Sequence, residues 1–240
     1  MEQAIKTLQT WIDESNNIVF FGGAGCSTES GIADFRSVDG LYNQTYAYPP
    51  EVILSHSFFE DNPKVFYQFH REKLVCPGVQ PNKAHLKLAQ LEKSGKLRAV
   101  ITQNIDGLHQ AAGSKKVLEL HGTIHRAYCA KCRRPYPEDY IHFGDGLPMC
   151  DCGGVVRPDI VLYEEGLDQD VLTDSVNYIE HADMLIVGGT SLVVYPAAGL
   201  LRYYRGRKLV LINKDATPYD AKADLVIHSP IGQVLDQIKV

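Results

Sequence analysis

The chain has 240 residues and carries 24 Lys and Arg against 29 Asp and Glu, a formal net charge of −5 at pH 7. With 45% hydrophobic and 22% charged residues, its composition is that of a globular protein and excludes a disordered or collagen-like chain. Because there is no general excess of basic residues, nucleic acid is not expected as the main partner. No apolar run approaches the roughly 20 residues that span a bilayer, and residues 1–17 lack the hydrophobic stretch of a signal peptide. We therefore expect a soluble, cytoplasmic protein with no membrane partner.

Apolar residues recur with helical spacing over residues 2–13, which predicts an N-terminal helix. Short, continuously apolar runs then follow, and such runs suit strands that are buried on both faces of a parallel sheet. The predicted strands are residues 18–21, 99–101, 117–120, 184–187, 209–212 and 225–227. Helices are predicted over residues 81–94 and 197–204. The alternation indicates an α/β fold with a Rossmann-like, doubly wound parallel sheet.

Two stretches interrupt this alternation. Residues 38–80 are rich in aromatic side chains and have a helical pattern in their second half, whereas residues 125–157 contain four cysteines and little periodicity. We predict that both are inserted in the fold and form a smaller second lobe, helical and zinc-binding. The Rossmann-like domain would then comprise residues 1–37, 81–124 and 158–240.

A glycine-rich segment, Gly23 to Thr28, directly follows the first predicted strand. In a dinucleotide-binding loop such glycines let backbone amides approach a pyrophosphate. Here Thr28 occupies the position of the last glycine, and the residues about 20 positions on, where a dehydrogenase has an acid, include Asn43 and Gln44. This disfavours an ordinary dehydrogenase. By itself the segment is compatible with a phosphate site and with a plain turn.

Four of the six cysteines lie within 24 residues, as Cys129-x2-Cys132 and Cys150-x-Cys152. Without a secretory signal these thiols are expected to be reduced, and two close thiolate pairs are typical of a closed, tetrahedral structural zinc site. The pattern predicts one zinc ion per chain. Unliganded thiols are the alternative, and the second pair is tighter than the usual C-x-x-C.

Polar residues follow the next predicted strands, in the segments Thr102 to Gly107 and His121-Gly122. An unperturbed histidine titrates near 6.5 and is therefore suited to general-base catalysis near neutral pH. The alternative is structural: His121 could belong to the core, and Asn104 and Asp106 could form turns or cap a helix. Their shared position beside the glycine-rich segment favours a site.

Together these segments resemble the motifs of the sirtuins, the NAD-dependent protein lysine deacylases. The first motif of that family is similar to residues 23–36, with Ala33 in place of its usual proline, and the second is similar to residues 102–106. The catalytic His-Gly pair is similar to His121-Gly122, and the later cofactor motifs are similar to residues 189–192, 196–198 and 212–213. The resemblance runs from about residue 18 to the C-terminus and is to the minimal catalytic core of bacterial-type members.

This resemblance implies an NAD-binding Rossmann lobe, a lobe with one structural Zn²⁺, and a tunnel between them for acyl-lysine. The implied reaction removes acetyl or another uncharged acyl group from lysines of proteins or peptides, and yields nicotinamide, 2′-O-acyl-ADP-ribose and free lysine. His121 would be the catalytic base and Asn104 would position the ribose and water. The implied NAD contacts are Ala24, Thr28, Phe35, Arg36, Gln103, Asn104, Ile105, Asp106, His121, Thr190, Ser191, Asn213 and Ile231.

The peptide is expected to pair as an added strand along Val161 and Tyr163. This chain differs from the family's Val-x-Phe-Gly-Glu segment, because Tyr163 replaces Phe and Glu164 replaces Gly. The added carboxylate either favours basic residues around the target lysine or points into solvent. The Tyr-x-x-Arg pair of desuccinylases is displaced here, since Arg71 lies one position too far from Tyr67. An uncharged acyl group is therefore predicted.

Two other functions remain open at the level of sequence. One is a zinc-containing protein that binds ADP-ribose or peptides with weak catalysis, because Ala33 and the tight cysteine pair could loosen the cofactor loop and the zinc lobe. The other is a mono-ADP-ribosyltransferase, which would use the same cofactor cleft.

Overall fold

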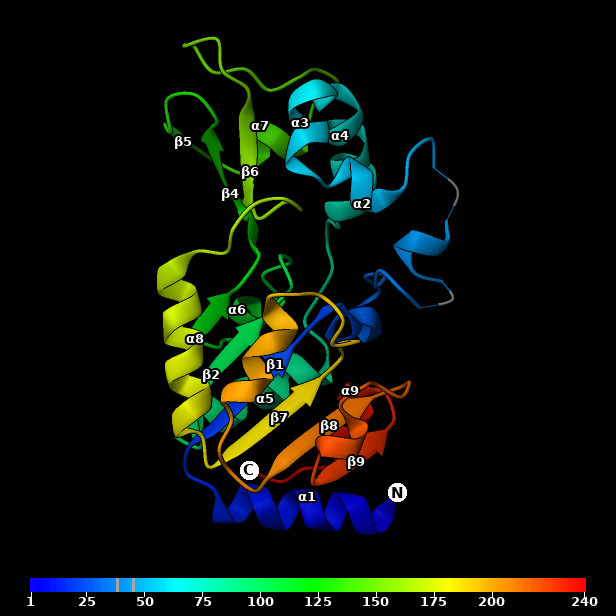
Figure 1. Cartoon of the computed structure of the whole chain (residues 1–240), viewed down its shortest axis with the longest axis vertical. Coiled ribbons are helices and arrows are strands. Elements are labelled where there is room, and N and C mark those ends of the chain that lie inside the picture. Colours follow the sequence, from blue (N-terminus) through cyan, green and yellow to red (C-terminus); the bar gives the residue numbers. More distant parts are fainter. Residues whose placement is uncertain (38, 45) are drawn as a thin grey trace.

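Six parallel strands form the larger sheet of the computed structural model, which describes residues 1–37, 39–44 and 46–240. The strand order is β3-β2-β1-β7-β8-β9, and Figure 1 shows the strands running side by side. The strands are β1 (Ile18–Gly22), β2 (Leu97–Thr102), β3 (Val117–Glu119), β7 (Met184–Gly188), β8 (Leu209–Asn213) and β9 (Leu225–His228). Each lies within two residues of its prediction. The order is that of the doubly wound Rossmann sheet, so the predicted fold class is confirmed.

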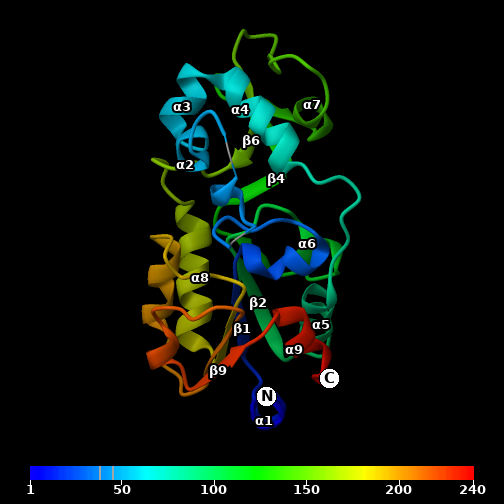
Figure 2. The same ribbon diagram turned by 90° about the vertical axis from the view of Figure 1, so that its right-hand side faces the viewer.

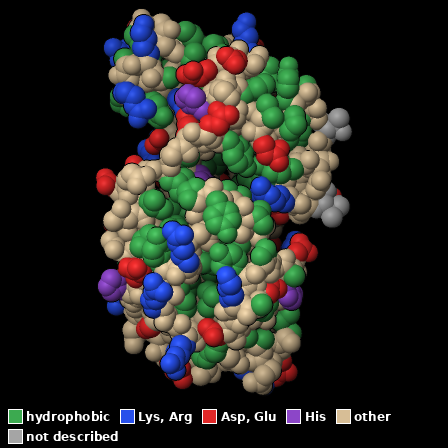
Figure 3. Space-filling view, in the orientation of Figure 1, with side chains coloured by type: hydrophobic (Ala, Val, Ile, Leu, Met, Phe, Trp, Pro, Cys, Tyr) green, Lys and Arg blue, Asp and Glu red, His purple; other side chains and the backbone are tan. Residues whose placement is uncertain are grey.

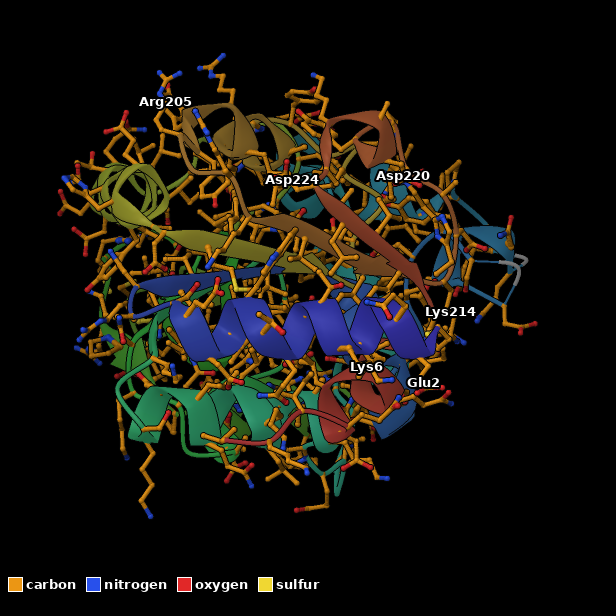
Figure 4. All side chains as sticks on the ribbon, turned by 90° about the horizontal axis from the view of Figure 1, so that it is seen from below. Glu2, Lys6, Arg205, Lys214, Asp220 and Asp224 are labelled. Carbon is orange, nitrogen blue, oxygen red and sulfur yellow. The ribbon has the colours of Figure 1, made fainter. Side chains whose placement is uncertain are left out.

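Helices cover both faces of this sheet. On one face α1 (Glu2–Glu14), α5 (Lys83–Lys93) and α9 (Ile231–Asp236) contribute to a buried apolar cluster with β1 and β8. On the other face α8 (Gln169–His181) and the 3-10 helix η5 (Ala197–Tyr203) pack in a second cluster. Seen from below, α1 crosses the foot of the sheet, with the ion pair of Glu2 and Lys6 at one end (Figure 4). The sheet is therefore buried on both sides, as its continuous apolar strands require.

A smaller lobe lies at the opposite end of the molecule from α1 (Figures 1 and 2). Its antiparallel sheet has the order β5-β4-β6, formed by β5 (Pro135–Tyr136), β4 (Gly122–Cys129) and β6 (Val156–Ile160). Its helices are α2 (Pro50–Ile53), α3 (His56–Asp61), α4 (Pro63–Phe69), the π-helical turn η4 (His70–Leu74) and α7 (Asp139–His142). Aromatic side chains of the helices pack on β4 and β6 in one apolar cluster.

The two strands β4 and β6 run across the domain boundaries expected at residues 124/125 and 157/158. Val38, the first residue of the expected lobe, lies outside the described residues. The division of the chain into 1–37, 81–124 and 158–240 against 38–80 and 125–157 therefore stays a prediction.

Several helices and strands were not predicted from the sequence, and α8 is the longest of them. Its start is defined by Asp168, whose carboxylate accepts hydrogen bonds from the amides of Asp170 and Val171. The predicted helix over residues 197–204 is a 3-10 helix instead. The short helix α6 (Leu108–Ala111), together with α9, was also missed. Over the described part of the chain, no helix combines the length and apolar character needed to cross a bilayer.

Candidate active site

A cavity of about 760 Å³ opens where β1 and β7 end, between the carboxyl edge of the larger sheet and the smaller lobe. Figure 3 shows the hollow between the two parts of the molecule. The volume is within the range of small-molecule sites. Every residue that the sequence analysis assigned to cofactor or substrate lines it: Ala24, Thr28, Phe35, Arg36, Gln103, Asn104, Ile105, Asp106, His121, Val161, Tyr163, Thr190, Ser191, Asn213 and Ile231. Leu54, Lys73 and Leu74 of the small lobe line it as well, so residues from both lobes meet at the point where the strand order reverses.

The loops after β1 and β7 touch through their backbones. The amide of Gly25 donates to the carbonyl oxygen of Gly189 over 2.7 Å. Gly189 has φ +59°, and a Cβ there would lie 2.2 Å from the backbone nitrogen of Cys26. Only glycine fits this position. The result is a floor of bare backbone beneath the cavity, the surface that a phosphate group can approach most closely.

The imidazole of His121 has a defined tautomer. Its Nδ1 lies 3.0 Å from the carbonyl oxygen of Gln103, and because a carbonyl only accepts, Nδ1 carries the proton and Nε2 keeps a free lone pair. Burial lowers the pKa of His121, and the hydrogen bond to the Gln103 carbonyl partly opposes that shift. His121 is therefore neutral at neutral pH and able to accept a proton.

Three polar side chains on neighbouring loops form one hydrogen-bonded group. The hydroxyl of Ser27 donates to Asp106 Oδ2 over 2.6 Å, and the amide of Asn104 donates to Ser27 Oγ over 3.0 Å and to Asp106 Oδ2 over 3.1 Å. The other oxygen of Asp106 accepts from the amide of Leu108, the first residue of α6. Ser27 was not predicted to be a site residue, although it lies within the first motif next to Thr28.

Asn213 has an unused donor at the cavity. Its Oδ1 accepts from the amide of Thr190 over 2.9 Å, and Gln103 Nε2 donates to Thr190 Oγ1 over 3.0 Å. The Asn213 amide nitrogen is buried and has no hydrogen-bond partner among the described residues. A buried, unsatisfied amide is costly, so this group fits a ligand oxygen at the end of β8. Together with the bare floor at Gly25 and Gly189, this end of the cavity fits a dinucleotide.

The segment from Val161 to Glu165 is fixed to both lobes by its backbone. The amide of Val161 donates to the His121 carbonyl over 2.9 Å, and that of Tyr163 donates to the Leu54 carbonyl over 2.9 Å. Glu164, which replaces the family's glycine, has the left-handed φ of +75°. Its carboxylate accepts from the amide of Ser57 over 2.9 Å and from the Ser57 hydroxyl over 3.0 Å, near the start of α3. The exposed Glu164 side chain is thus held by α3.

The four cysteines converge, as predicted. The Sγ atoms of Cys129, Cys132, Cys150 and Cys152 lie within 4.8 Å of one another. Sulfur separations of 3.5 Å (Cys129 to Cys152) and 3.6 Å (Cys132 to Cys150) approach the value of about 3.8 Å that tetrahedral zinc with Zn–S bonds of about 2.3 Å requires. Gly153, with φ +78°, follows the tight second pair in its turn. The thiol set therefore fits one structural Zn²⁺.

The pair displaced from the desuccinylase pattern lies outside this cavity. Tyr67 is buried and its hydroxyl donates to the Val156 carbonyl. Arg71 donates to the carbonyl oxygens of Ile141 and Gly146 over 3.3 and 2.7 Å. Neither Tyr67 nor Arg71 lines the cavity.

Comparison with known proteins assigns these features to one family. The model of the Sir2 family matches residues 23–196. The chain is 57% identical over 238 residues to an NAD-dependent protein deacetylase of Clostridium acetobutylicum, covering 98% of this chain and 97% of that protein. It is 56% identical over 242 residues to the enzyme of the same name from Clostridium perfringens, covering 99% of each.

Solved structures agree with this relationship. A complex of Sir2 with p53 peptide and NAD⁺ matches with a TM-score of 0.86 and 40% identity, over 96% of this chain and 95% of that one. A Sir2 homologue bound to NAD matches with a TM-score of 0.88 and 39% identity, over 97% of this chain and 91% of that one. The sequence resemblance is confirmed, and the chain belongs to the Sir2 family.

Proposed function

We propose that this chain is an NAD-dependent protein deacetylase, which transfers the acetyl group of a modified lysine to the ADP-ribose part of NAD and releases nicotinamide. Its relatives at 56–57% identity carry that name. The observation that carries the proposal is the free Nε2 of neutral His121 in a cavity that also contains the bare-backbone floor at Gly25 and Gly189.

The cofactor would bind along the carboxyl edge of the sheet. Ala24, Thr28, Phe35 and Arg36 would contact the pyrophosphate, and Thr190, Ser191, Asn213 and the backbone near Ile231 the phosphate and adenosine end. Gln103 would hold the nicotinamide ribose, and Ile105 and Asp106 the carboxamide. These assignments are supported by the common cavity lining and by the unpartnered Asn213 amide. Bound NAD supplies a sugar carbon that becomes reactive as nicotinamide leaves.

His121 would act as the general base on a ribose hydroxyl. Its protonated Nδ1 is anchored on Gln103, so Nε2 is the atom that accepts the proton. Burial favours the neutral form, which keeps the base available near pH 7. Asn104 would position the ribose and water, because its amide is oriented by Ser27 and Asp106.

The acetylated lysine would enter beside Tyr163 with its backbone along Val161 to Glu165. Related structures contain a p53 peptide, and the segment lines the cavity with its position fixed by backbone hydrogen bonds to both lobes. An acetyl or other uncharged acyl group is favoured, since the acidic-acyl pair, Tyr67 and Arg71, is used elsewhere in the small lobe.

The Zn²⁺ would stabilise the small lobe and take no part in catalysis, because four protein thiols fill its coordination.

The turn at Ala33 is ordered by the next residue, Asp34. The Asp34 carboxylate accepts a hydrogen bond from the amide of Ser37 over 2.9 Å, and the Asp34 carbonyl accepts one from the amide of Leu41 over 2.8 Å. Neither alternative, a weakly catalytic binding protein or an ADP-ribosyltransferase, has an observation of its own. A cytoplasmic location and the absence of nucleic-acid and membrane partners stay predictions.

The test mixes the protein with an acetyl-lysine peptide and NAD and follows nicotinamide release and the small-molecule product by mass spectrometry. We expect release that depends on the peptide and yields O-acetyl-ADP-ribose. His121→Ala should lose at least 100-fold in rate, on the order expected for loss of a general base. His181→Ala, at the exposed end of α8, is the matched control. No release by wild type, or undiminished release by His121→Ala, contradicts the proposal.

A further inference from the structure

The hydroxyl groups of Tyr42 and Tyr163 meet across the cavity, 2.7 Å apart. Tyr42 lies in the segment that follows the glycine-rich loop, and Tyr163 lies in the segment proposed to receive the peptide. Both rings line the cavity. Tyr163 stands where the family's segment has phenylalanine, so its hydroxyl departs from that pattern.

Tyr42 is tied to the residues proposed to contact NAD. Its amide donates to the Phe35 carbonyl over 2.8 Å, and its ring packs edge to face on Phe35 with a centroid distance of 5.5 Å. The guanidinium of Arg36 lies 5.0 Å from the centre of the Tyr42 ring. Burial and the hydrogen bond to Tyr163 raise the pKa of Tyr42. A shift of the Tyr42 ring would therefore move Phe35 and Arg36 with it.

Tyr163 is tied instead to the small lobe. Its amide donates to the Leu54 carbonyl over 2.9 Å, and its own carbonyl accepts from the His56 amide over 3.0 Å. Among the described residues of segments 34–44 and 160–167, the Tyr42–Tyr163 contact is the one hydrogen bond that joins the two segments. Tyr163 is 39% exposed, so the hydroxyl pair lies at a solvent-facing part of the cavity rather than in the core.

We infer that the Tyr42–Tyr163 hydroxyl pair couples the cofactor and peptide sites, so that ordering either segment favours binding at the other. The inference rests on the proposed function, which places NAD beside Phe35 and peptide beside Tyr163. Tyr163 is a positioning residue here: its hydroxyl orients Tyr42, and through Tyr42 the segment that carries Phe35 and Arg36. Such coupling is reciprocal, so peptide should tighten nucleotide binding by the same factor as nucleotide tightens peptide binding.

The test measures binding without turnover. ADP-ribose is titrated calorimetrically into the zinc-loaded protein, alone and with a saturating unmodified lysine peptide, and the ratio of the two Kd values gives the coupling factor. Tyr163→Phe and Tyr42→Phe keep the rings and each remove one hydroxyl. We expect each to lower the coupling factor roughly two- to tenfold, the worth of one neutral hydrogen bond, and the double variant to lower it no further.

Tyr46→Phe is the matched control. This substitution removes a nearby hydroxyl, which donates to Gln44 over 2.8 Å, and Tyr46 does not line the cavity. It should leave the coupling factor unchanged, and all variants should melt as wild type. The inference is overturned if the coupling factor is unchanged in Tyr163→Phe, or if the losses of the two single variants simply add in the double variant. In either case NAD-dependent deacetylation by the wild type still upholds the proposed function. A wild type without NAD-dependent deacetylation overturns both.

Discussion

Arg157, on β6, is the buried anchor of the segment proposed to bind the peptide. Its side chain is 7% exposed and donates to both carboxylate oxygens of Glu165, over 2.6 and 3.0 Å, and to the Ile160 carbonyl over 2.8 Å. Glu165 also accepts from the amide of Leu162 over 2.8 Å. Losing Arg157 would therefore leave a half-buried carboxylate without its main partner at the base of this segment.

We expect Arg157→Met to lower the free energy of unfolding by about 2–4 kcal/mol. Breaking a buried ion pair from one side costs about 3–5 kcal/mol. A somewhat smaller loss applies here because Glu165 is 21% exposed and keeps its bonds to Leu162 and His56. For a chain of this length the loss corresponds to a fall in Tm of about 4–16 °C. The KM for acetylated peptide should rise as the segment loosens.

The assay is urea and thermal unfolding at pH 7, with Arg126→Met as the control. Arg126 also bridges two carboxylates, Glu119 and Asp159, but its side chain is 58% exposed, so its loss should cost less than about 1 kcal/mol. Equal losses in the two variants would refute the reasoning from burial.

The same pair makes a pH-dependent prediction. Burial acts to raise the pKa of Glu165, but the hydrogen bonds from Arg157, Leu162 and His56 outweigh it and hold that pKa below its ordinary value. A lowered carboxylate pKa gives stability that is present above the unfolded value of about 4.3 and is lost as pH falls through the folded value. The difference in the free energy of unfolding between wild type and Arg157→Met should therefore become smaller below about pH 4.

Four further outcomes are expected. Because burial lowers the pKa of His121, the acidic limb of kcat/KM should lie below about 6.5, and a limb above it would contradict the neutral-base assignment. Burial, with the nearby His85, lowers the pKa of His109 to about 3. Since the unfolded chain then binds a proton that the folded protein does not, stability that is present above about pH 6.5 is lost as pH falls. His109→Leu should therefore take up about one proton fewer than wild type on unfolding at pH 5, and equal uptake would refute this. Chelation, or Cys150→Ser, should release about one zinc per chain and lower Tm, whereas metal-free protein with unchanged melting would remove the zinc assignment. Acetyl-lysine peptide should be turned over faster than succinyl-lysine peptide, and the reverse order would mean that a cation other than Arg71 reaches the acyl group.

The sheet could be predicted because its strands are continuously apolar, a local pattern that survives any tertiary arrangement. The helix α8 was missed although its sequence carries a local signal, because Val171, Leu172, Val176 and Ile179 recur with helical spacing after the capping residue Asp168. The antiparallel pairing of β4 with β6 joins residues far apart in the chain. Neither strand has a continuous apolar run, so no local signal distinguished them from loops.

The sequence by itself determined which groups are available to the site: glycines directly after strands, four thiols in two close pairs, and a histidine after a strand. The tertiary structure decided which of these groups meet, because contacts such as Tyr42 with Tyr163 join residues 121 positions apart. It also decided the protonation preference of His121, since burial and a carbonyl on another loop set its pKa and tautomer. Desolvation and hydrogen-bond direction are properties of the packed chain, and no single segment carries them.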